Sequence, residues 1–198
     1  MGTTNLGGDA AADFQRATHE VSSVSLRPEV RLTEVPAPTR IAPYAVALTA
    51  EVVTGVGEDE EELASGRFVL LHDPGEPEAW GGAWRIVSFA RAELEPEMAT
   101  DPMLGDVGWC WLTDSLRSCD AHAAAEAGTV TQVVSQGYGA LIENGTSVEM
   151  EVRASWTPLT AGGIGMGAHF EAWGTLLCTI AGLPPLPEGV VALPGQRR

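Results

Sequence analysis

The chain has 198 residues, 44% of them hydrophobic and 19% charged, which is typical of one globular domain and excludes a disordered chain. Its formal net charge is −16, because 27 acidic residues stand against 11 basic ones, and all the basic residues are arginines. A field of that sign repels nucleic-acid phosphates and anionic membrane surfaces, so we expect neither as a partner.

The cysteines and the N-terminal residues bear on the cellular compartment. The three cysteines form no C-x-x-C pair, and residues 1–12 lack the basic and apolar runs of a signal peptide. No stretch reaches the roughly 18 apolar residues of a membrane span. We therefore expect a reducing, cytoplasmic location.

The first half of the chain predicts one helix followed by four strands. Asp9 can cap a helix that ends before Pro28, and its apolar residues recur at helical spacing on one face: Phe14, Ala17, Val21 and Val24. The small, polar residues 1–8 are expected to be disordered. The strands follow over 30–35, 44–53, 67–72 and 83–95, with an acidic loop over 55–62 and a proline–glycine turn over 73–75.

The second half predicts a helix, two strands and a last helix. Asp106 can cap the first of these helices, and Gly182 closes the second. Their apolar faces carry Trp109, Leu112, Leu116 and Cys119, and then Phe170, Trp173, Leu177 and Ile180. The strands cover 129–135 and 148–156, and Asn144 with Gly145 predicts a type I′ turn into the later strand. The proline-rich residues 186–198 show no periodicity, and we expect them to be mobile.

Strands joined by turns and not by helices favour an antiparallel sheet. We therefore predict a single α+β domain over 9–185, mainly an antiparallel sheet with three helices packed on one side, in the order α-β-β-β-β-α-β-β-α. The strand over 83–95 carries apolar residues on both sides at its middle. We expect it to be central in the sheet and partly covered on both faces.

Several sequence blocks carry a family resemblance: LRPEV at 26–30, IAPY at 41–44, RAELEPEM at 91–98, GWCWLT at 108–113, RASWTP at 153–158 and EAW at 171–173. In this order they resemble an actinobacterial family catalogued as domain of unknown function number three thousand. The match spans about 26–185. The resemblance implies an actinobacterial source, and it supplies no activity and no catalytic residue.

The strongest candidate site lies along the second half of the fourth predicted strand. Arg91, Glu93 and Glu95 share one face of it, with Val87 and Phe89 before them, which indicates a groove. Carboxylates that converge beside an arginine can bind a cationic ligand or perform acid–base catalysis, with Glu93 or Glu97 as the base. The alternative is a solvated sheet face with cross-strand ion pairs, for instance to Arg153.

Two tryptophans stand outside the apolar stripes. Trp80 falls in a loop and Trp111 points off its helix stripe, so each is a candidate binding anchor or, alternatively, part of a small cluster under a loop. Cys110 near a helix start could be a nucleophile, but no histidine is linked to it in sequence, and a buried filler is the alternative.

Metal and nucleotide signatures are missing from the sequence. His72, Asp73, His122, His169 and Glu171 lack the spacing of zinc ligands, and we predict no metal site and no cofactor. Phosphate-binding and nucleophile-elbow motifs are absent.

These observations predict a non-enzymatic binding or adaptor domain, with a homodimer as one possible assembly. It would recognise a protein segment or small ligand through Phe89, Arg91, Glu93 and Glu95, with Trp80 or Trp111 as anchor. The alternative is a small hydrolase or isomerase that uses Glu93 or Glu97. A nucleic-acid accessory protein is the weakest alternative, because of the net charge.

Overall fold

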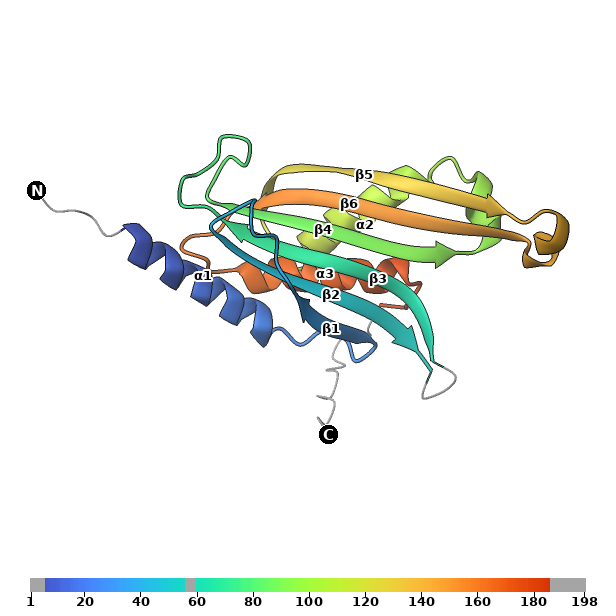
Figure 1. Cartoon of the computed structure of the whole chain (residues 1–198), viewed down its shortest axis with the longest axis horizontal. Coiled ribbons are helices and arrows are strands. Elements are labelled where there is room, and N and C mark those ends of the chain that lie inside the picture. Colours follow the sequence, from blue (N-terminus) through green and yellow to red (C-terminus); the bar gives the residue numbers. More distant parts are fainter. Residues whose placement is uncertain (1–5, 56–59, 186–198) are drawn as a thin grey trace, which may run out of the picture.

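The computed structural model describes residues 6–55 and 60–185. One antiparallel sheet of six strands, in the order β1-β2-β3-β4-β6-β5, dominates it (Figure 1). The strands are β1 (Val30–Val35), β2 (Tyr44–Thr54), β3 (Glu61–His72), β4 (Trp84–Leu94), β5 (Ala123–Gln136) and β6 (Thr146–Pro158). β4 lies in the interior of the sheet between β3 and β6, as the sequence predicts.

Three α-helices in the described part of the chain cover one face of this sheet (Figure 1). They are α1 (Leu6–Ser23), α2 (Leu104–Ser118) and α3 (Met166–Ile180). α3 packs on β3 and β4, α2 packs on α3 and β5, and α1 packs on α3. The predicted α+β class and element order are therefore confirmed. Among the described residues, no helix combines the length and the apolar character needed to cross a membrane.

The core lies between the sheet and α3. Alternate residues of β3, β4 and β6 face the helices because successive strand side chains point to opposite faces. Phe68 is fully buried there and meets the ring of Phe170 edge-on, with ring centroids 5.2 Å apart. Burial of each such side chain stabilises the fold by about 1.5–3 kcal/mol. The other large, fully buried side chains of this layer include Leu70, Ile86, Met150, Trp156, Trp173 and Leu177.

Gly66 allows α3 to approach the sheet closely. A Cβ atom at this position would lie 2.7 Å from Cδ2 of Leu177 and 2.7 Å from the carbonyl oxygen of Phe89. The indole Nε1 of Trp173 donates a hydrogen bond of 3.3 Å to that same carbonyl. α3 therefore holds the backbone of β4 at Phe89 from the covered side of the sheet.

The opposite face of the sheet carries only a small apolar cover. Ala47, Val69 and Leu71 form a second buried cluster, on which Trp80 and the 36–43 segment between β1 and β2 pack. Beyond this cluster, the face over β3, β4, β6 and β5 bears no helix (Figure 1). We predicted that β4 is partly covered on both faces. On the face without helices this holds for only part of the strand, because Val87 on that face is 40% exposed.

Some predicted boundaries were wrong. β3 begins at Glu61, within the predicted acidic loop, because its pairing with β2 continues past residues of low strand propensity. Asp106 lies inside α2, whose N-cap is Met103. Asn144 and Gly145 do not form a two-residue turn: β5 ends at Gln136, and a short 3₁₀ helix, η3 (Gly139–Asn144), belongs to the longer connection.

The predicted disorder at the two ends largely cannot be compared with the structure. Residues 1–5 and 186–198 lie outside the described residues, and so do residues 56–59 of the predicted acidic loop. At the N-terminal end, α1 begins at Leu6, so the helix starts before Asp9.

Candidate functional site

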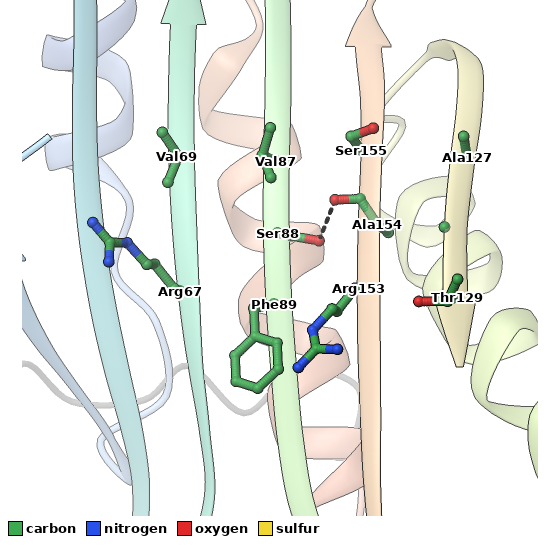
Figure 2. A pocket seen from close by; sticks show the side chains of 11 residues that line it. Arg67, Val69, Val87, Ser88, Phe89, Ala127, Thr129, Arg153, Ala154 and Ser155 are labelled. Atoms are coloured by element: carbon green, nitrogen blue, oxygen red, sulfur yellow. Dashed lines mark hydrogen bonds between the residues drawn. The ribbon is translucent and has the colours of Figure 1, made fainter. Parts of the chain in front are cut away.

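A cavity of about 660 Å³ lies on the uncovered face of the sheet (Figure 2). We call it the sheet-face cavity. Strand pairing builds its centre, because Phe89 on β4 is registered with Arg67 on β3 and with Arg153 on β6. Four strands contribute its walls: Arg67 and Val69 from β3, Val87 to Phe89 from β4, Ala127 to Thr129 from β5, and Arg153 to Ser155 from β6.

The lining of this cavity is cationic and partly apolar. Arg153 lies beside the ring of Phe89, whereas the side chain of Arg67 extends away from this ring (Figure 2). No carboxylate lines the cavity. The guanidinium carbon of Arg153 lies 5.4 Å from the centroid of the Phe89 ring, a cation–π arrangement. The Phe89 ring therefore offers an apolar surface beside a positive charge, which suits a ligand with an apolar part beside an anionic group.

The two arginines differ in their own partners. Arg153 forms an ion pair with Glu151, with 2.6 Å between Nη2 and Oε2. Arg67 donates a hydrogen bond of 3.2 Å to the carbonyl oxygen of Pro36 and forms no ion pair with a described residue. Exposed pairs of this kind contribute only about 0–1 kcal/mol, so an incoming anion can compete for Arg153 at small cost.

A third arginine, Arg85, supports the wall formed by β5. Arg85 is only 8% exposed. Its guanidinium donates to the carbonyl oxygen of Ala125 at 3.0 Å, to Oγ1 of Thr157 at 2.9 Å and to Oγ of Ser155 at 2.7 Å. Desolvation by burial lowers the pKa of Arg85, and the negative charge of Glu126 partly offsets this by raising it. The β5 ladder shifts register between Ala124 and Ala127, so Arg85 ties this bulge to the sheet beside the cavity.

The predicted site residues on β4 lie next to this cavity and do not line it, apart from Phe89. Arg91 pairs with Glu149 on β6, at 2.6 Å between Nη2 and Oε2. Glu93 is exposed and is registered with Glu149. Glu95 follows the end of β4 and precedes the short 3₁₀ helix η2 (Pro96–Thr100), which contains Glu97. The cross-strand ion pair of the alternative interpretation is therefore present at Arg91.

The two candidate tryptophans are on opposite sides of the sheet. Trp80, in the β3–β4 loop, packs on the Ala47–Val69–Leu71 cluster, and its carbonyl accepts a hydrogen bond from Thr157. Trp111 lies on α2 and packs against the main core under the helices. Because Phe89 faces the other side, Trp111 cannot contact a ligand in the sheet-face cavity, and it drops out of the candidate site.

Sequence reasoning did not select Arg67 for the site, and it treated Arg153 only as an ion-pair partner. The available signal was a charged residue at an alternate position of a strongly apolar strand, as Arg67 is before Phe68 and Val69. That signal identifies the face of one strand. It does not identify which residues of other strands lie opposite.

The cysteine and metal candidates do not gather into a site. Cys110 is exposed on α2, whereas Cys178 is buried, and burial raises the pKa of its thiol to about 11. Within residues 6–55 and 60–185, no group of three or more His, Cys, Asp or Glu side chains is placed to hold a metal ion.

Comparison with known proteins assigns a family but no activity. No curated protein and no solved structure matches the chain. A family model described as "Protein of unknown function (DUF3000)" matches residues 10–191, which includes every strand and helix α2 and α3 and most of α1. The chain therefore belongs to the DUF3000 family.

Proposed function

We propose that the protein is a binding domain whose sheet-face cavity recognises a segment of a partner protein in which an acidic side chain neighbours an apolar one. The observation that carries this proposal is the guanidinium of Arg153 beside the ring of Phe89, with Arg67 on the neighbouring strand, in a cavity that no carboxylate lines. This arrangement occurs in a chain of net charge −16, so the positive lining is a local exception. Bidentate arginine contacts to a carboxylate supply both energy and orientation.

The openness of the cavity favours a protein segment over a small molecule. Sites for small molecules bury most of the ligand surface. Here Arg67, Val87, Thr129 and Arg153 are all exposed, so a ligand would lie across the strands and stay accessible on its outer side. An extended peptide can make such a contact and gain further area along the face.

Selection from a library of displayed random peptides on the full chain tests this proposal. We expect enriched peptides to place Asp or Glu next to an aromatic or branched apolar residue. We expect enrichment to be lost with Arg67→Gln and Phe89→Ala, and retained with Arg117→Gln, which removes a charge from the exposed side of α2. Enrichment of basic peptides, or equal capture by all variants, would overturn the proposal.

A parallel titration with sodium 2-naphthoate separates the two ligand classes. This compound is a small aromatic carboxylate with the same chemistry as the proposed segment. If naphthoate shifts the amide resonances of Val87 to Phe89 while no peptide is enriched, the ligand is a small molecule and the protein-segment proposal is wrong.

The enzyme alternative receives no support from the arrangement of its carboxylates. It requires a deep pocket that contains Glu93 or Glu97. Both side chains are exposed, and neither lines the sheet-face cavity. We therefore propose no reaction.

The remaining partner and location expectations stay predictions. The absence of nucleic-acid binding and the cytoplasmic location rest on charge and composition alone. A homodimer is supported by exposed apolar residues on and beyond the β5 edge, namely Val133, Val134, Tyr138, Leu141 and Ile142. Sedimentation equilibrium tests it: the wild type should be a dimer that Leu141→Asp dissociates, and a monomeric wild type would refute it.

A further inference from the structure

The two edges of the sheet, β1 and β5, differ in how they are protected (Figure 1). β1 has six residues, carries Arg31 and Glu34, and is followed directly by Pro36. β5 has 14 residues, and the chain contains no charged residue from Ala127 to Ile142. Short strands, charged side chains and prolines keep an edge strand from pairing with another chain. β1 is therefore guarded against such pairing, and β5 is not.

The outer backbone groups of β5 over 127–136 have no partner among the described residues. β5 pairs with β6 on its inner side, and no other described segment forms a backbone–backbone hydrogen bond with it. The ladder is regular over this range, because the bulge lies before Ala127. Within it, every residue except Val130 and Thr131 is exposed. The free edge is therefore about 34 Å long.

Exposed apolar side chains flank this edge on both faces of the sheet. Val133 points to the uncovered face and is 41% exposed, whereas Val134 points to the helix side and is 49% exposed. Beyond the strand, the connection to β6 exposes Tyr138, Leu141 and Ile142, which we call the apolar tip. A strand that pairs here has to be uncharged and apolar on both faces. β5 itself meets this requirement.

A second copy of the chain matches the edge through a two-fold axis. In an antiparallel pair of β5 strands the residue order is reversed, so the apolar tip of each copy lies beside the alanine-rich start of β5 in the other. Pairing over 127–136 supplies roughly ten hydrogen bonds, the number in a typical protein interface. The uncharged edge matters because two copies, each of net charge −16, repel one another elsewhere.

We propose that β5 pairs antiparallel with β5 of a second copy, which joins two sheets of six strands into one of twelve. This pairing gives the expected homodimer a defined interface, and both sheet-face cavities open on the same face of the joined sheet. Five strand spacings, about 24 Å, separate the two copies of Phe89 across the sheet. The reversed strand direction also shifts them along the strands, to roughly 30 Å apart.

Sedimentation equilibrium of two charge-matched variants tests the interface in the protein alone. Val134→Glu on β5 and Leu32→Glu on β1 each add one negative charge at an exposed apolar position of an edge strand. We expect Val134→Glu to weaken dimerisation about ten-fold or more, because it puts a charge into the paired edge, and Leu32→Glu to leave it unchanged. Salt should strengthen wild-type dimerisation by screening the repulsion between the copies. A monomeric wild type, equal effects of the variants, or weakening by salt would overturn the proposal.

Hydrogen exchange locates the paired strand. Exchange of the backbone amides in 127–136 should slow as the protein concentration rises, while exchange in 30–35 of β1 stays the same. A dimer without this protection uses another interface, which contradicts the proposal. If the wild type stays monomeric and a selected peptide protects 127–136, the edge accepts a foreign strand and the second copy is the wrong occupant.

Two cavities on one face also predict avidity for a partner with two acidic–apolar segments, a consequence that rests on the proposed function. The probe is one selected peptide, used singly and as two copies joined by a glycine–serine linker. A linker of about 20 residues averages roughly 25 Å and can span the two cavities, whereas one of about 4 residues reaches at most about 14 Å. We expect the long-linker peptide to bind wild type about ten-fold or more tightly than the single peptide. The short linker and Val134→Glu should abolish this gain.

The two proposals fail in different ways in this experiment. If the single peptide does not bind, recognition at the sheet-face cavity is wrong, while the sedimentation and exchange results still decide the β5 interface. If the single peptide binds and the long linker adds no affinity, the joined sheet of twelve strands is wrong.

Discussion

Replacing His169 by asparagine should make the stability of the protein less sensitive to pH. His169 lies on α3 and is buried, and its Nδ1 accepts a hydrogen bond of 3.1 Å from Nε1 of Trp156. Burial, and to a smaller extent His122, lowers the pKa of His169 from 6.5 to about 4. Asparagine carries an amide oxygen that can accept from Trp156, and it does not titrate.

The size of the effect follows from the difference in proton binding between the two states. Above pH 6.5, His169 is neutral in both states, and its full contribution to stability is present. As the pH falls from 6.5 toward 4, the unfolded chain binds a proton that the folded chain does not bind, so stability is lost by about 1.4 kcal/mol per pH unit. At pH 5 the loss from this residue should be about 2 kcal/mol.

Urea unfolding followed by tryptophan fluorescence, at pH 7 and pH 5, measures this contribution. The other titrating groups act in both proteins, so the difference between wild type and His169→Asn isolates His169. We expect the variant to be less stable than wild type at pH 7, and this deficit to shrink by about 2 kcal/mol at pH 5. A deficit that is the same at both pH values would refute the argument that His169 stays neutral in the core.

Two further predictions concern packing and helix capping, and urea unfolding checks both. Gly66→Ala should lower the free energy of unfolding by about 1–3 kcal/mol, because its Cβ would clash with a backbone oxygen. Gly105→Ala on α2 is the control and should not lower the free energy of unfolding, because no atom lies within 4 Å of its Cβ. An equal loss of stability in both variants would contradict this prediction. Glu20→Gln should cost about 0.5–1 kcal/mol at low salt, because the Glu20 carboxylate accepts from the N–H of Gly165 and Gly167 at the start of α3. An unchanged stability would exclude that role.

The helices and the strand order along the chain were predictable, since local periodicity determines them. Phe14, Ala17 and Val21 recur at helical spacing, and all three pack toward the main core. Boundaries were less predictable where pairing overrides propensity. The alanine-rich start of β5 shows this: Ala123 and Ala124 are poor strand formers, yet they pair with Pro158 and Thr157 of β6.

The candidate site was only half predictable, because it depends on contacts between distant parts of the chain. Alternation along β4 correctly put Phe89, Arg91 and Glu93 on one face. The neighbours of Phe89 across the sheet are Arg67 and Arg153, and this register is set by the whole sheet. Likewise, whether Trp111 faces a ligand or the core depends on how α2 packs, which its own stripe did not reveal.

The most direct test of the proposed function is the affinity of one selected acidic peptide for two single-charge variants, measured by isothermal titration calorimetry. Arg153→Gln removes a guanidinium beside Phe89, and Arg117→Gln removes one from the helix-covered side. We predict binding about ten-fold weaker for Arg153→Gln, the loss expected for a charge-assisted hydrogen bond, and unchanged for Arg117→Gln. Equal affinity for both variants would contradict recognition at the sheet-face cavity.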